Sequence, residues 1–274
     1  MTKLYLLGDI GDYSKKLNNL LKKIKQNIKQ DDLIIILGDN FYPVGINDIN
    51  DIQVDNFKKS FDIFNNDIYM ILGNHDYILN PSCQINSPYW KMKNWYYSIN
   101  YYNYTLYFLD TVQLFPSEHI DGTRIKKTHN DYLDNLYNKQ LLWFENELKE
   151  NKNKNKLVFG HYPIISNGDY YYDFVKLYNR LFPLFRKYNV KAYFSGHEHN
   201  FQFIKRNFDN YTFYQFICGN SGDVRKNTVK YDRINFKEDI FYNETCCYIE
   251  VDISESKLKI SVHDNNDELY NYYI

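Results

Sequence analysis

Five stretches of the chain share one pattern, in which a glycine stands directly before a side chain that can bind a metal ion. Carboxylate, imidazole and phenol groups are all present, and this combination suits transition metals better than calcium. The five stretches are Gly8-Asp9-Ile10-Gly11, Gly38-Asp39-Asn40-Phe41-Tyr42, Gly73-Asn74-His75-Asp76, Gly160-His161-Tyr162-Pro163 and Gly196-His197-Glu198-His199.

The potential ligands in these stretches are too many for one metal ion. Two carboxylates, a phenolate, an amide and three imidazoles exceed a single tetrahedral zinc site but suit two octahedral ions that share a ligand. Asp39 is the expected bridge, because its strand is central in the predicted order. Without metal, the charges of Asp9, Asp39 and Tyr42 would repel one another. The candidate residues are Asp9, Asp39, Tyr42, Asn74, His75, His161, His197 and His199.

Each candidate also has an ordinary structural explanation when it is considered alone. An aspartate after a strand often caps a helix, and Asn74 is typical of turns. His161 could be a core histidine, and Tyr42 could pack in a chain with 29 tyrosines. His197 and His199 would face one side of a strand, which is equally a packing pattern. All five stretches follow apolar runs, however, and that recurrence favours a common site.

The apolar runs predict buried strands at 4–7, 33–36, 68–72, 157–159 and 192–195. Apolar residues recur at helical spacing from 17 to 28, with Ser14 as the N-cap, and a second helix is expected to begin at Asp55. This alternation predicts a parallel sheet with right-handed crossovers. If the five strands share one sheet, their loops meet at the edge where open α/β sheets bind ligands.

The rest of the chain is less regular. Residues 95–99 and 106–110 predict a hairpin, and 113–138 shows no clear period. The expected elements that follow are a helix over 139–150, a solvated turn over 151–156, a helix over 174–188 interrupted near Pro183, and strands over 213–218, 246–252 and 257–263. No linker divides the chain, so we expect a single domain over residues 1–274.

Composition argues against several kinds of partner. The formal net charge is −1, so no basic field attracts nucleic acid or an anionic membrane. No apolar run reaches membrane-spanning length, and no signal-peptide core precedes Asp9. The four cysteines lack metal-binding or disulfide-framework spacing, which is typical of reduced thiols. We expect a cytoplasmic or other intracellular protein, although three N-x-[ST] sequons leave secretion open.

Together the five stretches resemble the signature blocks of the purple acid phosphatases, a branch of the calcineurin-like metallophosphoesterases. The resemblance is greatest to the small, tartrate-resistant type, and it extends to Asp110-Thr111-Val112. It covers residues 3 to about 219, and Tyr42 separates this branch from other calcineurin-like enzymes. The resemblance implies an α/β fold, a four-layer αββα sandwich of two mixed β-sheets flanked by helices.

The resemblance also implies a role for each candidate. The set implied for Fe(III) is Asp9, Tyr42 and His199, and the set implied for a divalent iron, zinc or manganese ion is Asn74, His161 and His197. Asp39 would bridge the ions, Asn74 and His75 would contact the substrate phosphate, and His75 would protonate the leaving group. The ions would polarise the phosphoryl oxygens and lower the pKa of bound water. The implied reaction is hydrolysis of phosphate monoesters. The expected substrate is a small-molecule phosphate ester or a phosphopeptide.

One family feature is missing. Family members carry another histidine between the fourth and fifth blocks, whereas residues 164–178 contain none. We therefore expect a pH optimum broader than the acidic one that the family name implies. The candidate partners of His75 are His119, His129, Tyr170, Tyr171, Tyr172 and Asp173. A phosphodiesterase or nucleotidase at the same site and a catalytically silent scaffold are the alternative functions, and the complete ligand set argues against the scaffold.

Overall fold

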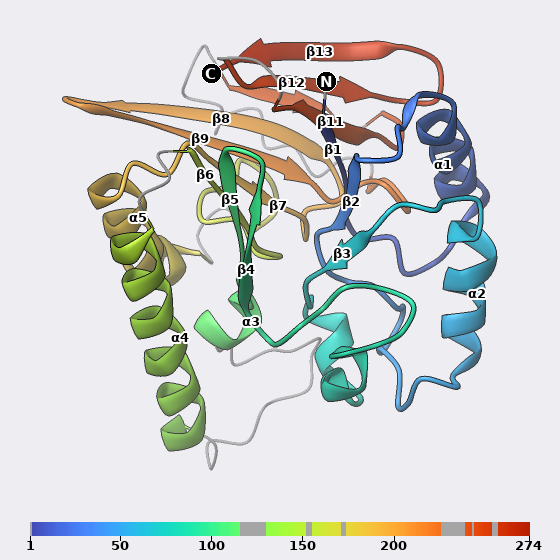
Figure 1. Cartoon of the computed structure of the whole chain (residues 1–274), viewed down its shortest axis with the longest axis horizontal. Coiled ribbons are helices and arrows are strands. Elements are labelled where there is room, and N and C mark those ends of the chain that lie inside the picture. The colour runs from blue at the N-terminus through green and yellow to red at the C-terminus, as the bar shows by residue number, and fades with distance from the viewer. Residues whose placement is uncertain are drawn as a thin grey trace.

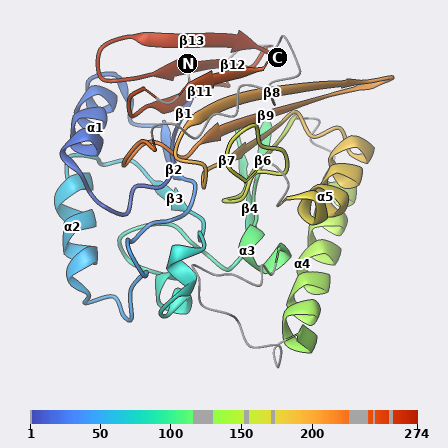
Figure 2. The same ribbon diagram turned by 180° about the vertical axis from the view of Figure 1, so that it is seen from behind.

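Two β-sheets lie face to face between two layers of helices (Figures 1 and 2). The structure is a computed structural model that describes residues 2–115, 130–151, 155–170, 174–225, 239–242, 244–253 and 257–274, with only the backbone at 130–136. Helices α1 (Lys15–Asn27) and α2 (Ile52–Phe61) cover one outer side. Helices α4 (Asn130–Glu150) and α5 (Val175–Lys187) cover the opposite side. This arrangement confirms the αββα sandwich.

The first sheet has six strands in the order β13-β12-β11-β1-β2-β3. The strands are β1 (Lys3–Leu7), β2 (Leu33–Ile36), β3 (Ile68–Met70), β11 (Tyr248–Asp252), β12 (Lys259–His263) and β13 (Glu268–Tyr273). β1, β2 and β3 run parallel, whereas β11, β12 and β13 pair antiparallel with their neighbours. β2 therefore lies between β1 and β3, in the central position predicted for the strand before Asp39.

The second sheet has seven strands in the order β10-β8-β9-β7-β6-β5-β4. The strands are β4 (Tyr97–Tyr101), β5 (Tyr104–Phe108), β6 (Asn155–Phe159), β7 (Ala192–Ser195), β8 (Phe201–Phe208), β9 (Tyr211–Cys218) and β10 (Ile240–Tyr242). β5, β6, β7 and β9 are parallel, and the other pairs are antiparallel. The five strands before the candidate ligands are thus divided between the two sheets rather than gathered in one.

A row of stacked aromatic rings crosses the inner face of the seven-stranded sheet. Each ring lies on the ring from the neighbouring strand, with centroids between 4.6 and 5.4 Å apart. Such pairs contribute roughly 0.5–1.5 kcal/mol each beyond the area that they bury. The rings belong to Tyr97, Phe108, Phe159, Phe194, Phe216 and Phe203. The row supports the alignment of β6 and β7, whose C-terminal ends lead to three candidate histidines.

A second apolar cluster fills the space between this sheet and α4 and α5. Val158 and Tyr193 alternate along their strands with members of the aromatic row, so they face the helices. Phe144 of α4 and Phe185 of α5 pack in the same cluster. Both faces of the seven-stranded sheet are therefore buried, which explains why its central strands are continuous apolar runs.

Helix α1 follows the prediction closely, whereas α2 begins earlier than predicted. Ser14 caps α1 and accepts a hydrogen bond from the Leu17 N–H at 3.2 Å. The cap of α2 is Asp51, which accepts from the Gln53 N–H at 3.0 Å, and not Asp55. Val54 is buried, so the apolar face of α2 begins before Asp55, where the helix was predicted to start.

Two helices on the other side differ from prediction. α4 begins at Asn130 rather than at 139, because its asparagine-rich and aspartate-rich first turns hide the helical pattern. α5 continues through Pro183, where an interruption was expected. Pro183 removes one backbone hydrogen bond on the exposed side of the helix, while Leu181 and Phe182 stay buried beside it. Burial of the apolar face keeps α5 intact.

The expected solvated turn over 151–156 and the expected hairpin also needed correction. β6 already begins at Asn155, and Lys156 is buried at 7 % exposure. The hairpin strands lie two residues nearer their turn than predicted, because Tyr102 adopts a φ of 52° and allows a tight connection. In the C-terminal part, β9, β11 and β12 confirm predicted strands, whereas β8, β10 and β13 were not predicted. None of the described helices is both long and apolar enough to cross a membrane.

Candidate metal centre

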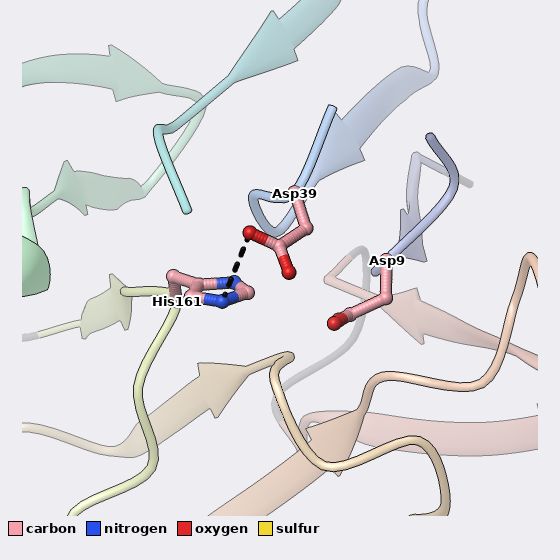
Figure 3. Close-up of side chains that lie close together, drawn as sticks. All are labelled: Asp9, Asp39 and His161. Carbon is pink, nitrogen blue, oxygen red and sulfur yellow. Dashed lines mark ion pairs between the residues drawn. The ribbon is translucent and has the colours of Figure 1, made fainter. Parts of the chain in front are cut away.

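Two buried aspartates follow the ends of β1 and β2. Asp9 and Asp39 have left-handed backbones with φ of 55° and 52°, a conformation that costs non-glycine residues about 1–3 kcal/mol. The Asp9 N–H donates to the Gly38 carbonyl at 3.2 Å, which joins the two loops. Both carboxylates lie beside His161, which follows β6 of the other sheet (Figure 3). These three residues each offer a ligand atom, and the atoms lie within 4.8 Å of one another.

The loop after β3 passes so close to Asp39 that only glycine fits at position 73. A Cβ atom on Gly73 would lie 2.2 Å from both the backbone nitrogen and Oδ1 of Asp39. The same loop holds the carboxylate, because the His75 N–H donates to Asp39 Oδ1 at 3.0 Å. The third loop of the first sheet therefore fixes the side chain predicted to bridge two ions.

The hydroxyl of Tyr42 lies among three potential acceptors. It is 3.1 Å from Asp9 Oδ1, 3.0 Å from Asp39 Oδ2 and 3.2 Å from His199 Nε2. A phenol has one proton, so it can satisfy only one of these atoms. The remaining lone pairs face one another in a buried space, and a bound cation would satisfy them together.

His161 brings a similar excess of lone pairs to the other side of Asp39. Its Nδ1 lies 2.8 Å from the Leu37 carbonyl, which can only accept, so Nδ1 carries the proton. In the neutral ring, Nε2 then has a lone pair, yet it lies 3.0 Å from Asn74 Oδ1 and 3.4 Å from Asp39 Oδ1. Asp39 Oδ1 has a donor in the His75 N–H, but the three acceptor atoms still face one another, which is the arrangement expected of ligands around a cation.

His197 and His199 come from the loop between β7 and β8 and not from a strand. The His199 Nε2 is 3.5 Å from Asp9 Oδ1. His197 has a φ of 70°, and its N–H donates to Asp9 Oδ2 at 2.8 Å. The His197 ring lies 5.2 Å from the His161 ring, nearly perpendicular to it. The loop thus ties the second sheet to Asp9 and places both imidazoles at the same centre.

Burial favours the neutral form of every titratable side chain in the centre, which suits the imidazoles as metal ligands but opposes ionisation of the acidic groups. Burial raises the pKa of Asp9 well above its usual range, and the charge of Asp39 raises it further. Burial likewise raises the pKa of Tyr42. It lowers the pKa values of His161 and His197, and that of His199 to about 4, so these rings are neutral, as metal ligands must be. A cation would offset the cost of ionising the carboxyl and phenol groups.

His75 differs from the other three histidines in its position. Its side chain is 16 % exposed, whereas Asp39 beside it is buried. Its Nδ1 lies 2.6 Å from the Pro43 carbonyl, and its Nε2 lies 3.9 Å from Asp39 Oδ2. The His75 backbone N–H binds Asp39 within the centre, whereas the His75 ring lies on the solvent side. The side chains of Tyr42, His161 and His199 contact the aspartates, and Asn74 and His197 join them through His161.

Sequence reasoning assigned no role to three residues that support or border this centre, namely Asp76, Glu198 and Arg225. Asp76 accepts from the Gly73 N–H at 2.8 Å and the Asn40 N–H at 3.1 Å, so it joins two ligand loops. Glu198 accepts from Ser166 and from the Tyr170 N–H. Asp76 and Glu198 stand inside the signature blocks, and that position was a usable signal. No sequence pattern indicated Arg225. Tyr170, a candidate partner of His75, lies against the His197 ring with centroids 4.6 Å apart. The remaining candidate partners of His75 (His119, His129, Tyr171, Tyr172 and Asp173) lie outside the described residues.

Comparisons with known proteins agree with this geometry. The tartrate-resistant acid phosphatase type 5 of Homo sapiens is 32% identical over 197 residues, which cover 64% of this chain and 57% of that protein. The chain thus matches little more than half the length of that relative. The resemblance to the tartrate-resistant purple acid phosphatases is confirmed by this similarity.

Two solved structures share the fold. A Plasmodium protein described as GAP50, the anchor in the inner membrane complex, has a TM-score of 0.74 at 19% identity over 100% of this chain and 88% of that one. A purple acid phosphatase from yellow lupin seeds has a TM-score of 0.73 at 16% identity over 100% of this chain and 53% of that one. The sequence model of the calcineurin-like phosphoesterases matches residues 2–201. The chain therefore belongs to the calcineurin-like phosphoesterase family.

Proposed function

We propose that this protein is a metal-dependent hydrolase of phosphate monoesters with a binuclear, iron-containing centre. One observation carries the proposal: buried oxygen and nitrogen atoms of the kinds that bind metal ions converge from loops of both sheets and face one another. The family match and the acid phosphatase relatives support the same reaction class. The substrates that we propose are small phosphate esters or phosphopeptides.

The contacts suggest how two ions would be divided among the ligands. Asp39 would bridge them, because Oδ2 faces Tyr42 while Oδ1 faces His161. The Fe(III) set would be Asp9, Tyr42 and His199, and the set for divalent iron, zinc or manganese would be Asn74, His161 and His197. When bound, such ions act as Lewis acids toward phosphoryl oxygens and lower the pKa of water.

The chain's own residues would bind and protonate the substrate. Asn74 and His75 would contact the phosphate from the third loop of the first sheet. The Pro43 carbonyl accepts from His75 Nδ1, which leaves Nε2 directed toward Asp39 and available to hold a second proton. A protonated His75 at the solvent side could deliver that proton to the leaving alkoxide. The buried carboxylates behind it would remain shielded from bulk water.

The alternatives are a phosphodiesterase or nucleotidase at the same site and a catalytically silent scaffold. The structural likeness to the Plasmodium anchor protein extends to the fold alone at 19% identity. A scaffold has no need of acceptor atoms crowded without protons, because buried unsatisfied polar groups are costly. The convergence of ligands therefore favours catalysis.

The test compares an aryl phosphate with a bis-aryl phosphate, using protein as purified, stripped by a chelator, and reloaded with iron and zinc. We expect faster hydrolysis of the monoester, loss of activity on stripping and recovery on reloading. Faster hydrolysis of the diester would favour the phosphodiesterase. A metal-loaded protein that hydrolyses neither ester would favour the scaffold.

A further inference from the structure

We propose that Arg225, held by Tyr170, binds the phosphate of the substrate at the mouth of the metal centre. The proposal rests on the proposed function, since it names a binding residue for the same substrates. It would explain how the chain provides positive charge on the side where the family's additional histidine is absent.

The backbone places Arg225 at the edge of the centre. Its N–H donates to the His199 carbonyl at 3.2 Å, so it is joined directly to a loop of candidate ligands. The preceding segment lies against the loop of Asp9: the Ser221 N–H donates to the Gly8 carbonyl at 3.2 Å, and a Cβ on Gly222 would lie 2.3 Å from the Asp9 carbonyl oxygen. Because this segment is packed on the site, Arg225 has a defined position.

The side chain of Arg225 is exposed but is held on the site by Tyr170. One guanidinium nitrogen, Nη1, lies 3.3 Å from the Tyr170 hydroxyl. The Tyr170 ring lies on the His197 ring with centroids 4.6 Å apart. The guanidinium is therefore anchored beside an imidazole of the centre while the residue remains exposed to solvent.

A buried carboxylate fixes Tyr170 in this position. Glu198, between His197 and His199, accepts from the Tyr170 N–H at 3.2 Å and from the Ser166 hydroxyl. Only glycine fits at position 168, where a Cβ would lie 2.4 Å from Glu198 Oε2. The loop that carries Tyr170 is thus bound to the loop that carries two candidate ligands.

The charge of Arg225 acts on the centre. Tyr170 holds the guanidinium beside the ring of His197, a candidate ligand of the centre. A cation in this position would attract a phosphate bound at the centre. Guanidinium groups suit phosphate oxygens, because they present several N–H donors in one plane and keep their charge at all ordinary pH values.

The test measures binding of inorganic phosphate to metal-loaded protein by calorimetry, together with KM and kcat for an aryl phosphate. Arg225→Ala should raise the Kd for phosphate by ~10-fold to ~100-fold, the range for hydrogen bonds to charged groups. Arg225→Lys should recover part of this loss, because it restores charge without the planar donor array. Tyr170→Phe should weaken binding only a few-fold, since the ring would still cover His197.

The control is Arg186→Ala, which removes the same charge from the last turn of α5, where the guanidinium lies over Phe208. It should leave phosphate binding unchanged. Arg225→Ala should also lower kcat/KM more for the monoester than for the diester, because the monoester carries more negative charge. An unchanged phosphate Kd, or loss of bound metal in Arg225→Ala, would overturn the proposal. Absence of hydrolysis in wild type would instead count against the proposed function, and calorimetry would still test Arg225.

Discussion

The two sheets supply different chemistry to one centre. The loops of β1, β2 and β3 contribute the proposed oxygen ligands, namely the two aspartates, Tyr42 and Asn74. The loops of β6 and β7 contribute the imidazoles of His161, His197 and His199. Burial works against ionisation of Asp9 and Tyr42, whereas it holds the three imidazoles in their neutral form. A bound metal ion would therefore stabilise the ionised side chains from the first sheet more than the neutral imidazoles from the second.

The difference also concerns how the loops are connected. Hydrogen bonds already cross between the sheets: His197 N–H donates to Asp9, and His161 Nδ1–H donates to Leu37. These bonds involve the backbone on at least one side, so they position the ligands before metal binds. The centre is thus largely preorganised, and single ligand changes should affect metal binding more than folding.

The largest effect is expected from Asp39→Ala. Asp39 is the proposed shared ligand, and its two oxygens face Tyr42 and His161 on opposite sides. The change should disturb both metal sites and reduce phosphatase activity to background. Metal analysis and an aryl phosphate assay would measure this. Full activity in Asp39→Ala would contradict the bridging role.

The next largest effect is expected from His75→Ala. His75 belongs to the first sheet's loops, but its ring lies at the solvent side and is not a proposed ligand. Metal content should stay the same, and kcat should fall by ~10²–10⁴-fold if His75 is the general acid. Loss of metal in this variant would show instead that the ring is a ligand.

Tyr42→Phe tests whether the first sheet contributes a phenolate ligand in addition to its carboxylates. A phenolate bound to Fe(III) gives a charge-transfer band, so the oxidised, iron-loaded protein should be violet or pink. The variant should lose this band while the three imidazoles remain. Visible absorption spectra of the two proteins measure the effect. Coincident spectra would make Tyr42 a packing residue and leave only the broader phosphoesterase assignment.

The smallest effect is expected at Asp110, a buried carboxylate after β5 that has protein donors of its own. It accepts from the Tyr77 hydroxyl and from the Gln113 N–H, and burial raises its pKa to about 7. The folded state therefore keeps a proton that the unfolded state releases near pH ~4. Its contribution to the free energy of unfolding should fall as pH rises from about 4 to about 7 and stay low above.

Asp110→Asn should remove this pH dependence, because asparagine does not titrate and can still cap α3 (Thr111–Leu114). Urea unfolding near about pH 5 and about pH 8 would measure the difference, which is at most ~3 kcal/mol at ~1.4 kcal/mol per pKa unit. Equal pH dependence in both proteins would show that Asp110 does not retain its proton in the folded state.

The sequence was most informative where residue type and position coincide. The apolar runs correctly predicted β1, β2, β3, β6 and β7. The candidate ligands could then be identified as the polar residues directly after these strands. The division of these strands between two sheets was implied only by the family resemblance, since a strand's apolar pattern does not identify its neighbours. The interruption predicted at Pro183 was wrong, because burial of the surrounding residues outweighs the loss of one backbone hydrogen bond in α5.

The supporting residues were harder to predict. Asp76 and Glu198 act by accepting backbone N–H groups from other loops, and such contacts depend on tertiary structure. Arg225 lies far in sequence from the blocks and reaches the centre only because its segment packs on the loop of Asp9. Nothing in the local sequence carries that information.

The most direct test of a binuclear centre between the two sheets is the metal content of the wild-type protein. It would be measured by elemental mass spectrometry on purified protein that has been shown to be folded. We predict two metal ions per chain, at least one of them iron. A folded protein that binds one ion or none after incubation with iron, zinc and manganese would contradict the proposed centre.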